Sequence, residues 1–188
     1  WPVSRKTYPK QFSKIYGRNT LVQQLALRTV SSEKIIFQSH IAITNEDYRF
    51  IISDQLNEIG IKLEHTLIEP EPKNTAPAIV SVAHYLYQMD ADAVMLVAPA
   101  DHIISDAVEF HTAIEKGLQY VHDGKILTFG ITPSHPETGY GYLELEHHKI
   151  HADGVKKVKK FIEKPDIKTA QKMIQSGRFL WNSGIFLF

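Results

Sequence analysis

The chain has no cysteine among its 188 residues, which excludes a disulfide framework and a thiolate nucleophile or ligand. The formal net charge is zero, from 21 basic and 21 acidic residues, and no basic run stands out beyond Lys156-Lys157 and Lys159-Lys160. A nucleic-acid or membrane-surface role therefore has little support. No apolar run approaches the roughly 18 residues of a membrane helix, and no signal peptide is recognisable. We expect a cytoplasmic protein with no membrane or nucleic-acid partner.

The composition, with 43% apolar and 22% charged residues, is typical of a globular domain with a substantial core. The chain begins at Trp1 without an initiator methionine and ends at Phe188 inside an apolar stretch. Ending a sheet there would leave strand edges unpaired. We therefore interpret residues 1–188 as a single, incomplete domain, truncated at both ends of a longer chain.

Strand-like and helix-like segments alternate along the sequence. Short apolar runs predict strands at 41–44, 63–68, 93–98, 126–131, 140–146 and 155–162. Helical spacing of apolar residues predicts helices at 12–29, 48–59, 75–89, 110–121 and 168–175. This alternation indicates an α/β fold, with a Rossmann-like, mostly parallel sheet and helices on both faces.

Two apolar, aromatic-rich stretches near the end of the chain, one beginning at Phe161 and the other at 179–188, are typical of buried strands but contain polar residues. Glu163 and Lys164 end the first stretch, and Asn182 and Ser183 lie in the middle of the second. Buried polar groups cost free energy unless something satisfies them, so several that converge from different strands suggest a ligand. A lysine that meets an anion and a glutamate that meets hydroxyl groups would suit a sugar phosphate.

Asp101 follows the predicted buried strand 93–98. Because ligands of open α/β sheets bind beyond the carboxyl ends of the strands, this carboxylate is well placed to hold Mg²⁺ between phosphates. Asp101 would equally serve as a cap of the next helix or turn. One aspartate is also few ligands for Mg²⁺, which usually takes one or two carboxylates together with phosphate oxygens.

Asn74 and Thr75 open the helix predicted at 75–89, where free backbone N–H groups would let a base or a phosphate approach closely. The plainer reading is a threonine cap at Thr75, followed by Pro77 in the first turn. The loop Glu137–Tyr142 contains Gly139 and Gly141. These glycines fit either a close approach to a ligand or a hairpin turn.

Three cations, Arg5, Lys6 and Lys10, lie within six residues around the helix start marked by Pro9. Cations near the positive end of a helix are unfavourable unless an anion lies among them. A triphosphate would supply that anion, and a solvated basic segment is the alternative. A further group, His147, His148 and His151, fits an exposed polar turn better than a metal site.

In their order and spacing, these stretches resemble the mannose-1-phosphate guanylyltransferases of bacterial polysaccharide biosynthesis. The resemblance covers the whole chain. It rests on Trp1-Pro-Val-Ser-Arg5 with Pro9-Lys-Gln-Phe12, Asn74-Thr-Ala-Pro77, Pro99-Ala-Asp-His102, Thr128-Phe-Gly-Ile131 with Glu137-Thr-Gly-Tyr-Gly-Tyr142, Phe161-Ile-Glu-Lys-Pro165, and Leu180-Trp-Asn-Ser-Gly184.

The resemblance implies a nucleotide-diphospho-sugar transferase fold and the reaction of GTP with mannose 1-phosphate to give GDP-mannose and pyrophosphate. On the nucleotide side, it implies that Arg5 and Lys10 contact GTP, with Lys10 on the phosphates in the transition state. Asn74 and Thr75 would belong to the guanine pocket. Asp101 would be the first of the family's two carboxylate ligands for Mg²⁺.

On the sugar side, the resemblance implies that Lys164 binds the 1-phosphate and takes part in catalysis. Glu163 and Asn182 would contact the mannose, and Gly139 would meet the sugar through its backbone. The family's glycine-rich loop would precede Trp1 and its second metal carboxylate would follow Phe188. We therefore expect these 188 residues alone to have little or no activity.

Three other functions stay open at this stage. The nearest is another sugar-1-phosphate nucleotidyltransferase of the same fold, and the next is a non-catalytic nucleotide-sugar-binding protein. An NAD-dependent dehydrogenase has little support, because no Gly-x-Gly-x-x-Gly follows a first strand. Homo-oligomerisation and a downstream phosphomannose isomerase domain, which many members of the family carry, are also left open.

Overall fold

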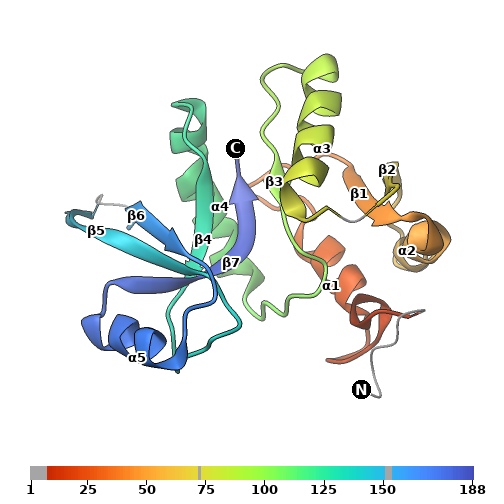
Figure 1. The fold of residues 1–188 in the computed structure, drawn as a ribbon. Helices are drawn as coiled ribbons and strands as arrows, with labels where there is room; N and C mark the ends of the chain where they lie inside the picture. Colours follow the sequence, from red (N-terminus) through yellow and green to blue (C-terminus); the bar gives the residue numbers. More distant parts are fainter. Residues whose placement is uncertain (1–7, 72, 151–153) are drawn as a thin grey trace. The chain divides into compact units, whose positions relative to one another are not determined.

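The computed structural model describes residues 8–71, 73–150 and 154–188, without the side chains of 147–150 (Figure 1). The chain divides into two compact units, unit 1 with Trp1–Glu115 and unit 2 with Lys116–Phe188. Each unit is described by itself below. The single domain over 1–188 stays a prediction.

Unit 1 contains a small parallel sheet surrounded by helices (Figure 1). Strands β1 (His40–Asn45) and β2 (Leu63–Glu69) pair in parallel, with Ile43 opposite Leu67. The elements of unit 1 are η1 (Lys10–Phe12), α1 (Leu21–Arg28), β1 (His40–Asn45), η2 (Glu46–Tyr48), α2 (Arg49–Glu58), β2 (Leu63–Glu69), α3 (Thr75–Met89), β3 (Leu96–Val97) and the first part of α4 (Ala107–His122).

The core of unit 1 lies where α1 and α2 meet η1 and β1. Its buried members are Phe12, Val22, Ala26, Ala42, Ile52 and Leu56. Phe12 is only 2% exposed, so its ring anchors the short η1 turn to the two helices. The turn is thereby fixed at one end by hydrophobic burial, which the sequence pattern alone did not reveal.

The start of α4 is tied to the end of α1 through a buried histidine. His111 Nε2 lies 2.7 Å from the carbonyl oxygen of Arg28, and Nδ1 lies 3.0 Å from Ser32 Oγ. Since a carbonyl oxygen only accepts, Nε2–H donates to Arg28, and in the neutral ring Nδ1 accepts from Ser32. Both nitrogens of this buried side chain are therefore satisfied.

Unit 2 is built around an antiparallel sheet. Its elements after α4 are β4 (Leu127–Ile131), β5 (Tyr142–Ile150), β6 (Lys156–Ile162), α5 (Ile167–Ser176) and β7 (Phe179–Leu187). Strand β5 pairs antiparallel with both β6 and β7, and β4 pairs antiparallel with β7. The lysine-rich β6 is exposed along most of its length, and charge of this kind protects a strand against unwanted pairing.

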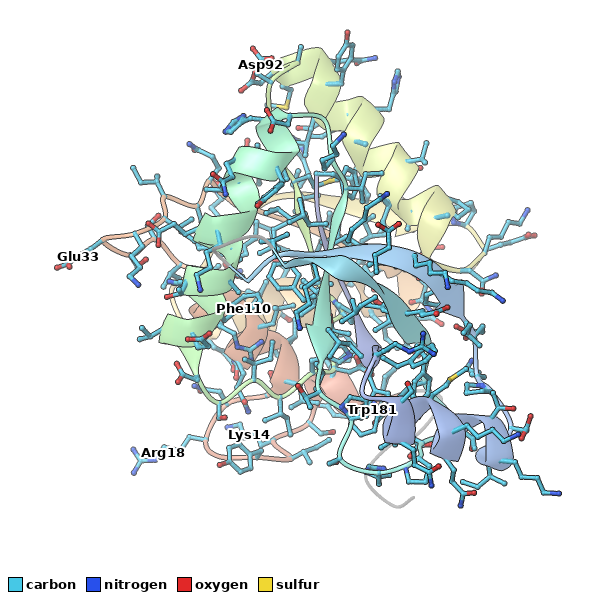
Figure 2. All side chains as sticks on the ribbon, turned by 90° about the vertical axis from the view of Figure 1, so that its left-hand side faces the viewer. Lys14, Arg18, Glu33, Asp92, Phe110 and Trp181 are labelled. Atoms are coloured by element: carbon cyan, nitrogen blue, oxygen red, sulfur yellow. The ribbon has the colours of Figure 1, made fainter. Side chains whose placement is uncertain are left out.

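Helix α5 covers one face of this sheet. Tyr142, Ala170, Met173 and Trp181 form the buried cluster between α5 and strands β5 and β7, and Trp181 lies beside α5 (Figure 2). Burial alternates along β7 from Trp181 to Leu187. The side chain of Asn182 consequently lies on the opposite face of the sheet from that of Trp181.

The predicted α/β class is confirmed, and most predicted elements occur with small shifts at their ends. Parallel pairing is found for β1 and β2, whereas the strand pairs inside unit 2 are antiparallel. The strand predicted at 93–98 is reduced to Leu96–Val97. The turn predicted around His147 and His148 is wrong, because β5 continues to Ile150, and His151 lies outside the described residues.

The helix predicted from Phe12 to Thr29 is also wrong in its first half, because α1 begins only at Leu21. A capping box stops it from starting earlier: Thr20 accepts from the Gln23 N–H, and the Gln23 side chain accepts from the Thr20 N–H. This threonine–glutamine spacing is a known start signal that the apolar periodicity concealed. Lys14 and Arg18 lie in the irregular segment before it, with exposed side chains (Figure 2).

The predicted cap of α3 is displaced by one residue. Asn74, not Thr75, occupies the N-cap position, with φ 63° and ψ −171° and without a side-chain capping hydrogen bond. Gly177 ends α5 in the left-handed conformation, with φ 66°.

The described helices include none that is both long and apolar enough to cross a membrane.

Gly177→Ala should destabilise unit 2. Its φ of 66° is left-handed, and no atom lies within 4 Å of the position that a Cβ would take, so the cost comes from the backbone conformation alone. We expect a loss of about 1 kcal/mol in the free energy of unfolding, measured by urea denaturation. Gly177→Asn, which tolerates this conformation better, should lose less, and equal losses would contradict the explanation.

Candidate functional site

Lys10 and Asp101 form an ion pair in unit 1. Lys10 Nζ lies 2.7 Å from Asp101 Oδ2, and both side chains are partly exposed, at 50% and 35%. Lys10 belongs to η1, whereas Asp101 follows β3 by several residues. The fold thus joins two predicted site residues that lie 91 positions apart in the sequence, one cationic and one anionic.

The charges around Asp101 favour its ionised form. Partial burial acts to raise the pKa of the carboxyl group, but the hydrogen bond and charge of Lys10, with the charge of His102, outweigh this effect and lower the pKa. His102 Nε2 lies 3.8 Å from Asp101 Oδ1. Burial lowers the pKa of His102, and although Asp101 opposes this, the charges of Lys10 and Arg28 add to it. His102 is therefore neutral at pH 7, and Asp101 carries a full negative charge.

Asp101 is the predicted metal ligand, and it offers a single carboxylate. Among the described residues, no group of three or more histidine, aspartate or glutamate side chains is arranged to hold a metal. A single partly exposed carboxylate does fit Mg²⁺, which keeps several waters and is commonly held by one or two carboxylates together with phosphate oxygens.

Asn74 and Thr75 are exposed at the start of α3. The backbone of Asn74 has a combination of φ and ψ that is normally restricted to glycine, and such strain is concentrated at functional sites. Within the described residues, no hydrogen bond or ion pair joins Asn74 or Thr75 to Lys10 or Asp101. Arg5, the remaining nucleotide-side candidate, lies outside the described residues.

In unit 2, Glu163 and Lys164 follow β6 directly. The Lys164 ammonium lies 3.3 Å from Glu163 Oε1, and both side chains are largely exposed. Lys164 has a φ of 41°, and its N–H donates to the Tyr140 carbonyl oxygen at 3.2 Å. Of the described residues other than glycine, only Asn74 and Lys164 have positive φ, and both are predicted site residues.

Gly141 brings Glu163 and Asn182 to one place. The Asn182 N–H donates to the Gly141 carbonyl oxygen at 2.8 Å. A Cβ on Gly141 would lie 3.1 Å from Glu163 Oε2 and only 2.6 Å from the ring of Phe161. The absence of a side chain at Gly141 therefore permits the close approach of the Glu163 carboxylate to Gly141, whose carbonyl oxygen is bonded to the Asn182 N–H.

The side chain of Asn182 is held by Thr128 on the neighbouring strand β4. Thr128 Oγ1 lies 2.9 Å from Asn182 Oδ1 and 3.1 Å from the Ile185 carbonyl oxygen. With the hydroxyl bonded to Oδ1, the amide N–H groups of Asn182 are left to donate to other partners. A polar residue in this position is suited to binding hydroxyl oxygens.

Gly139 has a different environment from the other sugar-side candidates. Its N–H donates to Glu137 Oε1 at 2.8 Å, and this hydrogen bond, with a further one from His135, lowers the pKa of Glu137. His135 and Tyr140 both contact the Trp181 ring edge to face. In this conformation the Gly139 N–H is already occupied by a carboxylate of its own loop.

Gly141 and Gly139 alike fitted a close approach to a ligand or a hairpin turn, and nothing in the sequence singled out Gly141 for the contact with Glu163, or Thr128 for the contact with Asn182. The Tyr-Gly-Tyr pattern was visible, but it did not show which glycine lies against Glu163, because that depends on the pairing of β5 with β6 and β7. Thr128 had no signal of its own, since a threonine in a β-strand is ordinary.

The comparisons with known proteins identify the class of the chain. The nucleotidyl transferase family model matches residues 1–188, and the chain therefore belongs to the nucleotidyl transferase family. Over its full length it is 41% identical to the mannose-1-phosphate guanylyltransferase of Escherichia coli strain K12, in an alignment of 192 residues that covers 40% of that protein. The predicted resemblance to mannose-1-phosphate guanylyltransferases is confirmed.

Other relatives agree with this family. The chain is 41% identical over 188 residues to the xanthan biosynthesis protein XanB of Xanthomonas campestris, with 100% of this chain and 39% of XanB covered. A solved structure of mannose-6-phosphate isomerase from Helicobacter pylori matches with a TM-score of 0.84 and 31% identity, covering 98% of this chain and 67% of that one. The chain spans about two-fifths of the length of the curated relatives it matches.

Gly141→Ala should disturb the contact of the Phe161 ring with Gly141, the residue directly before β5. A new Cβ would lie 2.6 Å from the Phe161 ring. Because this ring is 48% exposed and can shift, we expect a cost of about 1 kcal/mol, at the low end of that for overpacking in a core. We expect a lower free energy of unfolding in urea denaturation. In a Phe161→Ala background the same substitution should cost much less, and an equal cost in both backgrounds would show that the ring is not responsible.

Proposed function

We propose that the protein to which this chain belongs transfers the guanylyl group of GTP to mannose 1-phosphate, giving GDP-mannose and pyrophosphate. The observation that carries this proposal is the cluster of Glu163, Lys164 and Asn182 around Gly141, in a chain of the nucleotidyl transferase family. The identity to mannose-1-phosphate guanylyltransferases supports the choice of guanosine and mannose. The cytoplasm, where nucleoside triphosphates are available, is the compartment that this activity implies.

The reaction needs no side-chain nucleophile. A phosphate oxygen of mannose 1-phosphate attacks the α-phosphorus of GTP, a new P–O bond forms, and the bond between the α- and β-phosphates breaks to release pyrophosphate. The second pKa of a phosphate monoester is about 6, so the attacking group is largely ionised at pH 7. The main tasks of the protein are to align two polyanions and to offset their charge.

On the sugar side, Lys164 would bind and orient the attacking phosphate. Its ammonium group already lies next to a carboxylate, that of Glu163, and a phosphate would compete for the same donors. Glu163 would accept hydrogen bonds from mannose hydroxyls, while the Asn182 amide would donate to them. Gly139 would contribute its N–H to the sugar once Glu137 releases it.

On the nucleotide side, Lys10 would contact the phosphates of GTP, and Asn74, Thr75 and Arg5 would bind the rest of the nucleotide. Asp101 would hold Mg²⁺, which, when bound, neutralises charge on the phosphates. Before substrates bind, Lys10 and Asp101 would pair with each other. Asp101 then takes the place of the phosphate that Lys10 would bind, and Lys10 takes the place of the Mg²⁺ that Asp101 would hold. Binding of phosphate would exchange this internal pairing for pairing with the substrate.

The direct test is pyrophosphate release by the full-length protein. GTP should be compared with ATP, UTP and dTTP, and mannose 1-phosphate with glucose 1-phosphate. We expect the highest kcat/KM for GTP with mannose 1-phosphate. A clear preference for another pair would assign the protein to a different sugar-1-phosphate nucleotidyltransferase, and no release with any pair would favour a non-catalytic nucleotide-sugar-binding protein.

Lys164→Ala should raise KM for mannose 1-phosphate by roughly tenfold to a hundredfold, because a hydrogen bond to a charged group is lost. KM for GTP should change little, and steady-state kinetics with each substrate varied in turn will separate the two effects. Lys168→Ala is the matched control, since Lys168 is an exposed lysine on α5 in the same unit. Equal effects of the two substitutions would remove Lys164 from the sugar-phosphate site.

Asp101→Ala should lower kcat by about a hundredfold or more at every Mg²⁺ concentration, since it removes a metal ligand and exposes uncompensated phosphate charge. Asp92→Ala, at an exposed aspartate in the turn after α3 (Figure 2), should behave like the unmodified protein. Unchanged turnover in Asp101→Ala would show that Asp101 is not a metal ligand.

A further inference from the structure

We propose that Gln55 is a positioning residue for Lys10, acting through the η1 turn that carries this lysine. The inference rests on the proposed function only in that Lys10 contacts the phosphates of the nucleotide. Gln55 itself lies on α2, is 8% exposed, and would touch no substrate. Nothing in its sequence context singles it out as functional.

The carboxamide of Gln55 connects three elements of unit 1. Its Nε2 donates to the Phe12 carbonyl oxygen at 3.0 Å and reaches the Tyr8 hydroxyl at 3.4 Å. Its Oε1 accepts from Thr20 Oγ1 at 2.8 Å. Helix α2 is thereby linked to the N-cap of α1 and to the last residue of η1.

The orientation of this carboxamide follows from its partners. The Phe12 carbonyl oxygen only accepts, so the end of Gln55 that faces it must be the NH₂ group. Thr20 Oγ1 accepts from the Gln23 N–H as a helix cap, and its own proton is therefore available for Gln55 Oε1. A carboxamide satisfies both ends at once, whereas a carboxylate would set an acceptor against the Phe12 carbonyl.

Besides Gln55, the η1 turn is restrained by the Tyr8 hydroxyl, which donates to the same Phe12 carbonyl oxygen at 2.7 Å, and by its own backbone bonds. It is a three-residue 3₁₀ turn with backbone bonds from Phe12 N–H to Pro9 and from Ser13 N–H to Lys10, at 3.1 and 3.0 Å. The Lys10 side chain is half exposed and has four rotatable bonds, and its ammonium is held at its far end by Asp101. Once a phosphate replaces this ion pair, the position of the ammonium depends on the backbone of the turn. The Phe12 ring fixes the turn by burial, and two directional bonds converge on the Phe12 carbonyl oxygen: one from Tyr8, close by in the chain, and one from Gln55, which alone connects the turn to α2.

Gln23 offers a matched control for Gln55. It is 2% exposed, and its Nε2 donates to the Gln55 carbonyl oxygen at 2.7 Å and to Glu58 Oε2 at 3.0 Å. It belongs to the same buried network but has no hydrogen bond to the η1 turn. In either substitution a buried carboxamide is replaced by an apolar methionine side chain of similar volume. Only Gln55→Met also removes the hydrogen bond to the Phe12 carbonyl oxygen.

The first experiment compares the two variants in the full-length protein. Gln55→Met should lower kcat/KM for GTP by about threefold to tenfold, the range expected from the loss of one neutral hydrogen bond while Tyr8 still donates to the same carbonyl, and should leave KM for mannose 1-phosphate unchanged. Gln23→Met should lower the melting temperature by a similar amount but keep both kinetic parameters. Equal kinetic losses in the two variants would overturn the proposal, because they would reflect stability alone.

The second experiment asks whether Gln55 acts through Lys10. In a Lys10→Ala background, Gln55→Met should cause no further loss in kcat/KM, since the residue that it positions is already absent. Losses that multiply would overturn the proposal. Should Gln55→Met fail to fold, Gln55→Glu keeps the shape and the acceptor for Thr20, and the same comparison applies.

A third measurement is independent of the reaction. Hydrogen exchange at the Phe12 and Ser13 amides should be faster in Gln55→Met than in Gln23→Met or the unmodified protein. Unchanged exchange would refute the positioning of the turn, whatever the activity. Faster exchange in a protein that releases no pyrophosphate from GTP and mannose 1-phosphate would instead refute the proposed function and leave the structural link intact.

Discussion

The pairing of β7 with both β5 and β4 is the constraint on which unit 2 depends. Because side chains alternate along β7, Trp181 is buried under α5 while Asn182 lies on the other face. The same strand brings the Asn182 N–H to Gly141 and the Asn182 side chain to Thr128. Core packing and the candidate sugar site are therefore two faces of one strand, and a shift of one residue in register would exchange them.

Unit 1 relies on a different kind of restraint. Around η1, the hydrophobic burial of Phe12 is combined with a buried polar network of Thr20, Gln23 and Gln55. Buried polar groups of this kind stabilise little unless each is satisfied, but they specify one geometry. In this unit the geometry they specify is that of a turn whose first residue, Lys10, is paired with Asp101.

Much of the candidate site could be predicted from local patterns. The strand-to-loop transitions at Asp101 and at Glu163–Lys164, and the helix start at Asn74, each combine an apolar run with a polar end that is visible in sequence. The strained backbone of Asn74 and Lys164 was not visible, because φ is set by the surrounding structure and not by the residue type. The cap at Thr20 was visible as a pattern, and the helical period of the neighbouring apolar residues masked it.

Local periodicity and ordered motifs were enough to predict the α/β class, the family resemblance and the polar residues at the ends of the strands. Which of these residues contact one another follows from the folded arrangement of each unit. Lys10 forms an ion pair with Asp101, Glu163 packs against Gly141, and Gln55 donates a hydrogen bond to the turn that carries Lys10. In each case the two residues lie far apart in the chain. Such contacts depend on strand register and helix packing, which no local pattern encodes.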